Sequence, residues 1–157
     1  MNHNAEKLEV RKLTEGDVAA FHSLVNMFNM VFEEAEPAVS SDTNLLRLLS
    51  NDHFVAIAAF DENEVVGGLT AYELPMYSSE HSELFLYDLA VIPEYQRMGI
   101  GRSLIHALKD HCISKRIDVF FVLAHAEDEH AIEFYHSTGG RSEKVINFLY
   151  EAAVTNT

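Results

Sequence analysis

The sequence predicts one α/β domain over residues 1–157, built on a mixed sheet that is flanked by helices. Three observations lead to this fold class. Short apolar runs typical of strands are interspersed with amphipathic segments of helical period, in the order β-α-α-β-β-β-α-β-α-β. The length of 157 residues suits one domain, and 48% hydrophobic residues suffice for a core without disulfides or metal.

The first third of the chain predicts one strand followed by two helices. The expected elements are a strand at Leu8–Leu13, a helix over 18–32, an acidic loop at Glu33–Ser41 and a short helix at Thr43–Leu49. Apolar side chains recur at helical spacing from Val18 to Phe32. Thr14 and Asp17 form the pattern of a capping box before the first helix, and we expect Asp42 to cap the second.

The rest of the chain predicts five strands and two helices. The expected elements are strands at Phe54–Phe60, Val65–Leu74 and Glu83–Ile92, a helix at Gly101–Lys115, a strand at Val119–Ala124, a helix around 131–135 that ends at Gly139-Gly140, and a last strand at Val145–Tyr150. The turn residues Asp61–Glu64 join the first two of these strands as a hairpin.

The charge balance restricts the partners of the protein. A net charge of −14 repels the phosphates of nucleic acid and attracts cationic ligands, although acidity also serves solubility alone. The single cysteine, Cys112, excludes an intramolecular disulfide and fits the reducing cytoplasm. We expect no signal peptide and no membrane span, because no apolar run is long enough.

The segment from Asp88 to Ser103 predicts an anion site. It reads as a strand, a turn and a helix that opens on Gly99-Ile100-Gly101. Unpaired N–H groups at a helix start favour anions, and glycines let a phosphate approach the backbone. Arg97 and Arg102 add cations. Neither a dinucleotide fingerprint, which needs a glycine where Leu104 stands, nor a P-loop fits the segment.

Three stretches resemble the acetyl-CoA-binding motifs of the GNAT superfamily of N-acetyltransferases. They are Gln96-x-x-Gly99-x-Gly101, the preceding Leu89-Ala90-Val91 and the later segment 131–135 before Gly139. The resemblance implies a mostly antiparallel central sheet and acetyl-CoA as co-substrate. The residues that it implies for acetyl-CoA are Leu89, Ala90, Val91, Gln96, Arg97, Met98, Gly99, Ile100, Gly101, Arg102 and Ser103. Backbone N–H groups near Val91 would polarise the thioester oxygen.

Four segments, 54–60, 65–69, 71–75 and 82–91, are similar to type I aminoglycoside 3-N-acetyltransferases within that superfamily. This closer resemblance implies transfer of an acetyl group to the 3-amino group of a deoxystreptamine ring, and hence antibiotic resistance. The chain departs from that group at 125–131, where histidines enter and an aromatic residue is lost.

Direct attack of an amine on a thioester needs a base and an acid. Residues two apart on a strand share a face, so Glu83, Tyr87 and Leu89 should point together, and Glu83 is our candidate base on the face that resemblance assigns to the amine. Asp88, expected on the other face, Asp128 and water remain alternatives. Tyr135 matches the superfamily tyrosine that protonates the departing thiolate, whereas Cys112 reads as a core residue.

A small polycationic amine should be held by carboxylates and aromatic groups. The candidates are Glu33, Glu34, Glu73, Tyr87, Asp128 and Glu129. His125 and His130 form no metal-ligand pattern, so we expect no metal. Polyamines or protein amino groups are alternative substrates, and a non-catalytic acyl-CoA sensor is an alternative function. By the habit of the resembled family, we expect a homodimer.

Overall fold

The computed structural model describes residues 8–153. Its strands and helices are β1 (Leu8–Lys12), the short 3-10 helix η2 (Glu15–Asp17), α1 (Val18–Val31), α2 (Asp42–Leu49), β2 (Phe54–Asp61), β3 (Glu64–Pro75), β4 (Ser82–Val91), the 3-10 helix η3 (Pro93–Tyr95), α3 (Ile100–Lys115), β5 (Val119–Val122) and α4 (Glu129–Ser137). The chain divides into two units after Leu123, and each is described by itself.

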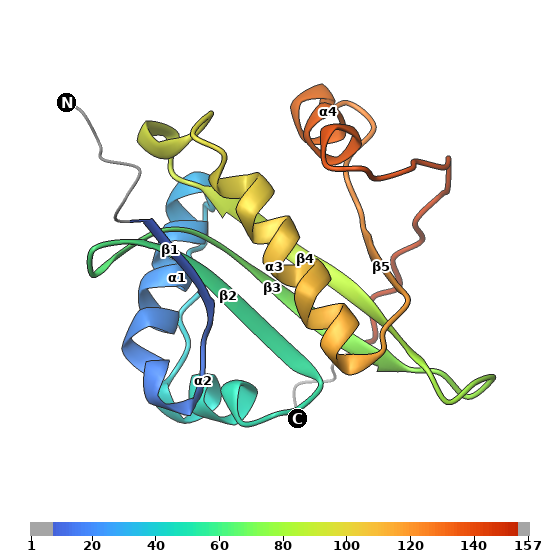
Figure 1. Cartoon of the computed structure of the whole chain (residues 1–157), viewed down its shortest axis with the longest axis horizontal. Helices are drawn as coiled ribbons and strands as arrows, with labels where there is room; N and C mark the ends of the chain where they lie inside the picture. Colours follow the sequence, from blue (N-terminus) through green and yellow to red (C-terminus); the bar gives the residue numbers. More distant parts are fainter. Residues whose placement is uncertain (1–7, 154–157) are drawn as a thin grey trace. The chain divides into compact units, whose positions relative to one another are not determined.

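The first unit is built on one five-stranded sheet with the strands in sequence order (Figure 1). Strands β1 to β4 pair antiparallel, and β5 pairs parallel with β4. Asp61 pairs with Glu64 at the hairpin between β2 and β3, where Glu62 takes a positive φ of 56°. The mixed, mostly antiparallel sheet is therefore confirmed.

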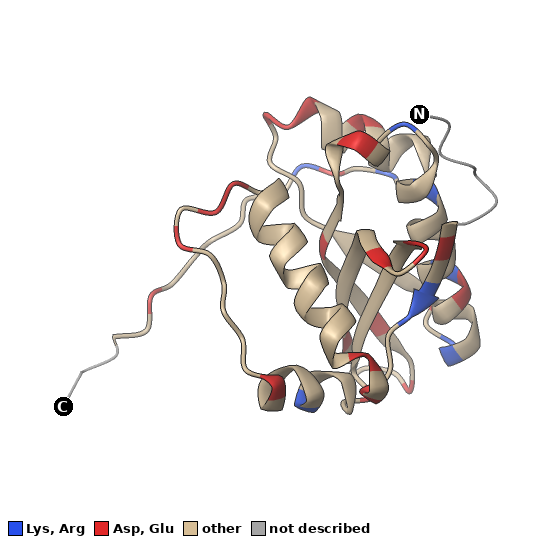
Figure 2. Cartoon of the chain, turned by 90° about the vertical axis from the view of Figure 1, so that its left-hand side faces the viewer, with Lys and Arg blue, Asp and Glu red and all other residues tan. Residues whose placement is uncertain are grey.

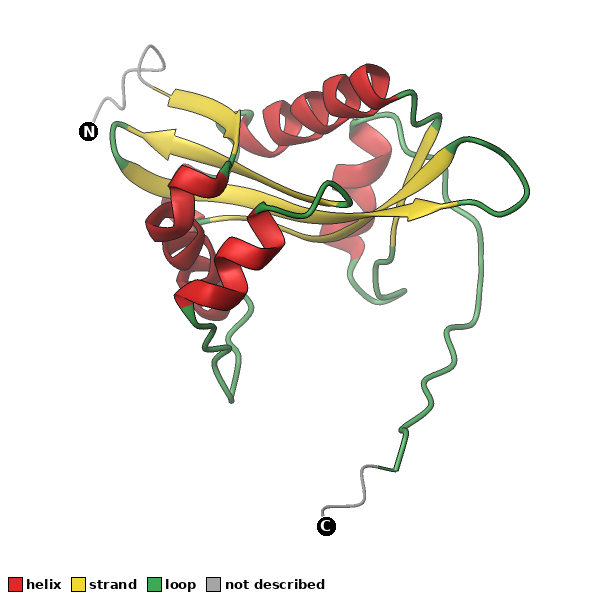
Figure 3. Cartoon of the chain, turned by 90° about the horizontal axis from the view of Figure 1, so that it is seen from below, coloured by secondary structure: helices red, strands yellow, loops and turns green. Residues whose placement is uncertain are grey.

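Helices cover both faces of this sheet. Figure 3 shows α1 and α2 on one side and α3 on the other. The core on the α1 and α2 side contains Phe21, Leu24, Leu45 and Phe54. Gly68 on β3 permits the close approach of α1, because a Cβ there would lie 2.4 Å from Leu24 Cδ1 and 2.8 Å from the carbonyl oxygen of Ile57.

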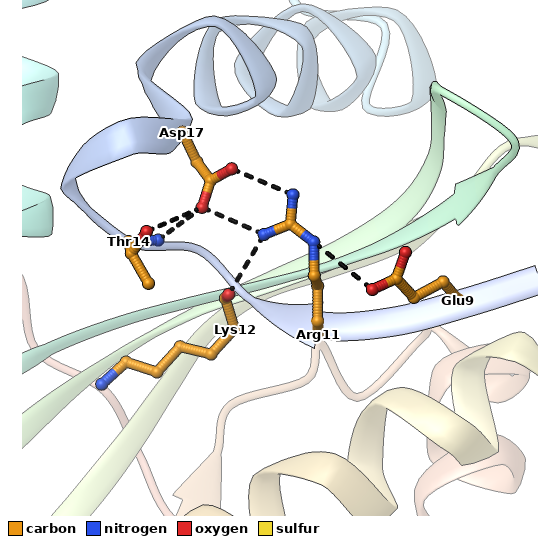
Figure 4. Close-up of polar contacts among 5 residues, drawn as sticks. All are labelled: Glu9, Arg11, Lys12, Thr14 and Asp17. Atoms are coloured by element: carbon orange, nitrogen blue, oxygen red, sulfur yellow. Dashed lines mark hydrogen bonds and ion pairs between the residues drawn. The ribbon is translucent and has the colours of Figure 1, made fainter.

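The corner between β1 and α1 is held by Asp17 (Figure 4). Its carboxylate accepts hydrogen bonds from both terminal nitrogens of Arg11, at 3.0 and 2.9 Å, and from the backbone N–H of Thr14 at 2.7 Å. The Arg11 hydrogen bond is the main cause that lowers the pKa of Asp17 to about 2. The side chain that the capping pattern identified thus ties the helix start to the first strand.

The faces of β4 change at a β-bulge. Tyr72 pairs with Phe85, but two residues earlier on β3 Thr70 pairs with Asp88, because the register shifts between Thr70 and Ala71. Asp88 therefore lies on the same face as Phe85. The expectation that Asp88 points away from that face was wrong, because strict alternation fails where one strand holds an extra residue.

Two further expectations were wrong. Ser41, not Asp42, is the N-cap of α2, and its hydroxyl accepts a hydrogen bond from Asn44 N at 3.1 Å. Residues 145–150 form no strand in the second unit, and their large apolar side chains are exposed. A strand needs a neighbouring strand to pair with, and the described part of the second unit contains none.

The second unit contains α4 followed by a segment without regular secondary structure. Asp128 caps α4 by accepting a hydrogen bond from Ala131 N at 3.0 Å. Gly139, with φ of 99°, ends the helix as the sequence predicted, and Gly140 N donates to the carbonyl oxygen of Tyr135.

None of the helices in residues 8–153 is long and apolar enough to cross a membrane.

Candidate active site

The loop between β4 and α3 is tied to the sheet at three points. Ile92 N donates to Val66 O at 3.0 Å, and Gln96 Nε2 donates to Val91 O at 2.9 Å. The Tyr95 hydroxyl donates to Asp61 at the β2 hairpin, which raises the pKa of the tyrosine to about 12. These bonds hold the glycine segment in a defined position at the end of the sheet.

Gly99 supplies the turn into α3 with φ of 83°, a conformation that other residues adopt at a cost. The first backbone bond of the helix runs from Ser103 N to Gly99 O. The N–H groups of Ile100 and Gly101 precede that bond, and the glycine N-cap has no side chain to accept from them. The buried side chain of Ile100 anchors this start in the core.

This helix start fits a pyrophosphate by its chemistry. Its donors are backbone N–H groups, and the helix dipole adds partial positive charge there. Space is open around Gly99, where a Cβ would have no atom within 4 Å. Arg97 and Arg102 are exposed beside it. The segment from Gln96 to Ser103 is therefore brought together as the sequence predicted, although which of its residues hold acetyl-CoA stays a prediction.

The α1 side of the sheet carries three aromatic residues and one carboxylate, Tyr72, Phe85, Tyr87 and Asp88. We call these four residues the acidic aromatic surface. The rings of Tyr72 and Tyr87 meet edge to face with centroids 5.7 Å apart. Phe85 contacts Tyr87 at 5.5 Å and stacks on Phe121 of β5 at 4.9 Å. Such rings offer apolar faces to a sugar and π faces to a cation.

Asp88 is the acid of this surface. Burial is the main cause that raises its pKa above the usual value, and the negative charge of Glu34 contributes. Asp88 in turn helps to raise the pKa of Tyr72, after burial and the neighbouring Tyr87. The charge of Glu34, in the loop after α1, thus acts on Asp88, and the role of Glu34 as a substrate ligand stays a prediction.

The other predicted substrate and base residues of the first unit, Glu83, Glu33 and Glu73, do not belong to the acidic aromatic surface. Glu83 shares its face but lies at the start of β4, about 16 Å along the strand from Asp88. Glu33 is exposed in the loop beside Glu34. Glu73 is on the opposite face, because it neighbours Tyr72 on β3, and its side chain is only 11% exposed.

Glu73 faces α3 rather than the acidic aromatic surface, and its role as a substrate ligand stays a prediction. Its Oε2 lies 3.7 Å from Nδ1 of His53 and has no hydrogen-bond partner among residues 8–153. The charge of Glu73 also acts on His111 and Cys112 of α3. Alternation along β3 was sufficient to foresee this placement, since Tyr72 and Glu73 must face opposite sides.

Three predicted residues belong to the second unit. Tyr135 lies on α4 with its ring 5.1 Å from that of Phe134, edge to face. Asp128 uses one carboxylate oxygen as the helix cap, and Glu129 is exposed in the first turn. The acid role of Tyr135 and the substrate role of the two carboxylates stay predictions.

Cys112 is a core residue, as predicted. It is buried on α3, and burial is the main cause that raises the pKa of its thiol to about 11. Within residues 8–153 no three His, Cys, Asp or Glu side chains are grouped as a metal site. The sequence reasoning overlooked Tyr72, although the Ala71-Tyr72-Glu73 stretch had been singled out for its resemblance.

Comparisons with known proteins agree with this arrangement. The model of the acetyltransferase (GNAT) family matches residues 21–139, which span both units. Two solved structures are aminoglycoside acetyltransferases from uncultured soil metagenomic samples. One, in complex with sisomicin, is 36% identical over 94% of this chain and 98% of that chain, with a TM-score of 0.91. The other is 37% identical over 93% and 99%, with a TM-score of 0.88.

A curated relative is the ribosomal protein bS18-alanine N-acetyltransferase of Escherichia coli K12, which is 35% identical over 57 residues. The matched stretch covers 36% of this chain and 38% of that relative. The family match extends over most of the chain and includes the loop and helix that carry the predicted anion site. The chain therefore belongs to the GNAT family of acetyltransferases.

Proposed function

We propose that the protein transfers the acetyl group of acetyl-CoA to an amino group of an aminoglycoside, at the 3-amino position of the deoxystreptamine ring. The observation that carries the proposal is the short distance along the chain between two complementary surfaces. The acidic aromatic surface ends at Asp88, and three strand residues and one short loop later the helix start at Gly99 offers N–H groups to phosphate.

The amine surface has the chemistry of an aminoglycoside ligand. Carboxylates at Asp88 and Glu34 attract ammonium groups, and the rings of Tyr72 and Tyr87 pack against sugar faces. The similarity to two aminoglycoside acetyltransferases over more than nine tenths of the chain supports this substrate class. The 3-amino position rests on the resemblance of segments 54–60, 65–69, 71–75 and 82–91.

The reaction forms a carbon–nitrogen and a sulfur–hydrogen bond and breaks a carbon–sulfur and a nitrogen–hydrogen bond. The amine nitrogen attacks the acetyl carbonyl carbon, the carbon–sulfur bond breaks, the nitrogen loses a proton and the sulfur gains one. We assign the proton acceptor to Asp88 rather than Glu83, because Asp88 lies nearer the anion site and burial raises its pKa. Tyr135 is the proposed donor to the thiolate, by its match to the family tyrosine.

Acetyl-CoA would be held by the chain's own backbone. The N–H groups of Ile100 and Gly101 fit its pyrophosphate, with Arg97 and Arg102 as flanking cations. The last residues of β4, Leu89 to Val91, would lie along its pantetheine arm, as the family motif implies. No covalent enzyme intermediate is needed, and the buried, weakly acidic thiol of Cys112 is unsuited to form one.

The test is turnover of acetyl-CoA with a panel of amines. Purified protein is assayed by release of the CoA thiol, a readout that buried Cys112 should not disturb. Sisomicin and other deoxystreptamine compounds should be acetylated, and NMR of the product should place the acetyl group on the 3-amino nitrogen. The proposal fails if no deoxystreptamine compound is acetylated.

A second candidate is acetylation of a protein N-terminus, supported by the 57-residue match to the bS18-alanine N-acetyltransferase. A peptide beginning with alanine and the polyamine spermidine therefore belong in the same panel. Acetylation of the peptide with inert aminoglycosides would favour this candidate. Binding of acetyl-CoA without turnover of any amine would favour a sensor.

A further inference from the structure

Helix α1 ends in a conformation that its sequence does not favour. Glu33 follows the helix with φ of 52°, in the left-handed region where glycine or asparagine is the common residue. Its N–H donates to Met30 O at 3.3 Å, and the next N–H, that of Glu34, donates to Asn29 O at 3.1 Å. These two bonds form the Schellman pattern of a helix end. A glutamate in the left-handed region is strained, and such strain persists only where the surrounding structure enforces it.

The side chain of Asn29 closes the loop that follows the helix. Its Nδ2 donates to Ala38 O at 2.9 Å, and its Oδ1 accepts from Ala38 N at 3.0 Å. The amide group thus pairs with both backbone groups of one residue, as a neighbouring strand would. We call these two bonds the loop clamp. Because the carbonyl group of Asn29 also accepts from Glu34 N, one residue is bonded to both ends of the segment 34–38.

The closed loop brings a negative charge to bear on Asp88. The helix that the loop leaves, α1, packs against β3 and β4. The charge of Glu34 acts on Asp88 of β4, where it adds to the effect of burial and raises the pKa of that carboxyl. Tyr72 and Tyr87, the other titratable groups of the acidic aromatic surface, bring no cation that would offset it. Whatever fixes the loop therefore also fixes the strength of this interaction.

We propose that Asn29 is a positioning residue of the acetyl transfer, which holds Glu34 where its charge acts on Asp88. The inference rests on the proposed function, in which Asp88 attracts the ammonium group and accepts its proton. With the loop clamp closed, Glu34 and Asp88 together present two carboxylates to a polycation. With the clamp open, the strained turn at Glu33 is free to relax, and the surface loses one of its two charges.

Two variants open the loop clamp from opposite sides. Asn29→Ala removes the amide from the helix, and Ala38→Pro removes the N–H that donates to Asn29 Oδ1 while it leaves α1 unchanged. The Ala38 amide should exchange with solvent about 5–10-fold faster in Asn29→Ala than in wild type, as expected for the loss of one hydrogen bond. Asn26→Ala is the matched control, because it removes an exposed amide one turn earlier on α1.

Carbon-13 NMR titration of the Asp88 carboxyl measures the effect on the acid without any turnover. In both clamp variants the pKa of Asp88 should fall, because the charge of Glu34 withdraws and burial alone remains to raise it. Glu34→Gln should lower this pKa as well, and adding Asn29→Ala to it should lower it no further. Thermal melting should show that every variant folds. A loss of stability alone would not move this pKa.

Steady-state kinetics connect the loop clamp to the substrate. At a pH above the titration of Asp88, the KM for sisomicin should rise about 2–5-fold in both clamp variants, the size expected for one exposed charge pair. The kcat and the KM for acetyl-CoA should stay near those of wild type, because the lost interaction is made equally in the ground state and the transition state. Asn26→Ala should match wild type in all of these measurements.

The outcomes separate this inference from the proposed function. Absence of aminoglycoside turnover together with the expected fall in the pKa of Asp88 would overturn the proposed function and keep the loop clamp. Turnover with an unchanged pKa of Asp88 in both clamp variants would overturn the clamp and keep the function. Losses in Asn29→Ala that Ala38→Pro does not share, or that Asn26→Ala shares equally, would assign Asn29 to the stability of α1 and overturn the proposal.

Discussion

At the scale of single residues, the proposed function gives Asp88 two tasks, to attract the ammonium group of the substrate and to accept its proton. A partly buried carboxylate near a second acid holds its proton more firmly than a carboxylate in water. The pKa of Asp88 is therefore closer to the working pH, which suits a general base. The neighbouring Tyr72 and Tyr87 supply no competing cation.

Replacing Asp88 by Asn should lower kcat/KM by about 10²–10⁴-fold near neutral pH. The wild-type rate should fall as pH falls through the raised pKa of Asp88, because only the ionised carboxylate accepts a proton. The Asn variant should lack that limb and recover partly as pH rises toward the amine pKa, where the substrate is already neutral. The measurement is a pH–rate profile.

Glu83→Gln is the matched control for Asp88→Asn, since it removes an acid from the same strand face farther from the anion site. Its profile should resemble that of wild type. If Glu83→Gln shows the loss and Asp88→Asn does not, the base is Glu83, as the sequence alone led us to expect. Equal profiles for all three proteins would assign proton removal to water or to Asp128.

Tyr135→Phe should lower kcat with little change in acetyl-CoA affinity, because donation to the thiolate develops only in the transition state. The CoA thiol is a fair leaving group, so we expect a loss near 10²-fold, the low end for one positioned acid. The measurement pairs steady-state kinetics with calorimetry of acetyl-CoA binding. Phe134→Leu removes the ring that contacts Tyr135 and should retain kcat. Full kcat in Tyr135→Phe would contradict the acid role.

At the scale of elements, the start of α3 and the start of α1 are built differently. α3 begins with a glycine in the left-handed conformation and no side-chain cap. The start of α1 is held by Asp17, which reaches Thr14 and Arg11. An uncapped helix start is available to a ligand, whereas a capped one serves stability.

Gly99→Ala should weaken acetyl-CoA binding by roughly 5–30-fold, because an alanine costs about 1–2 kcal/mol in the left-handed conformation. Gly99→Asn is the matched variant, since asparagine tolerates positive φ, and it should lose less affinity. Calorimetry with acetyl-CoA measures both. Unchanged affinity in Gly99→Ala would contradict the role of this turn in binding.

Asp17→Asn should reduce the free energy of unfolding by about 1–2 kcal/mol at neutral pH, a figure reduced for the partial exposure of Arg11. The pKa of Asp17 is lowered in the fold, so its stabilisation is complete above about pH 4 and is lost as pH falls through about 2. Urea unfolding of the variant should therefore show a flatter pH dependence between those values. Glu15→Gln, an exposed acid of the same turn, should leave the dependence unchanged.

The elements that were predicted correctly carry their own signals. Apolar runs and helical spacing identified the four α-helices and the five strands of the described chain, though not its two 3-10 helices, and the glycine pattern identified the start of α3. The bulge in β4 leaves no comparable signal, because it depends on register with β3, and it reversed the face expected of Asp88. The composition of 145–150 is that of a strand, yet a strand needs a neighbouring strand to pair with, and the described residues of the second unit contain none.

At the scale of the whole molecule, acids outnumber bases 25 to 11, and Figure 2 shows Asp and Glu recurring on helices and loops along the chain. Such an excess attracts a polycation from a distance but repels the phosphates of acetyl-CoA. The two substrates therefore meet opposite long-range fields, and the helix start at Gly99 must overcome this repulsion locally through its N–H groups.

Salt should separate these two fields. Raising the ionic strength from about 0.01 to 0.15 M shortens the screening length from about 30 to 8 Å, so the KM for the aminoglycoside should rise while the KM for acetyl-CoA does not rise in parallel. Glu33→Gln combined with Glu34→Gln should make the KM for the aminoglycoside depend less on ionic strength, because the charge of Glu34 acts on Asp88.

Glu15→Gln combined with Glu9→Gln removes two acids near β1 as a matched control and should leave the salt dependence of this KM close to that of wild type. Steady-state kinetics at several salt concentrations measure both slopes. Equal slopes for the two double variants would mean that the net charge of the chain, rather than carboxylates at the acidic aromatic surface, draws in the amine.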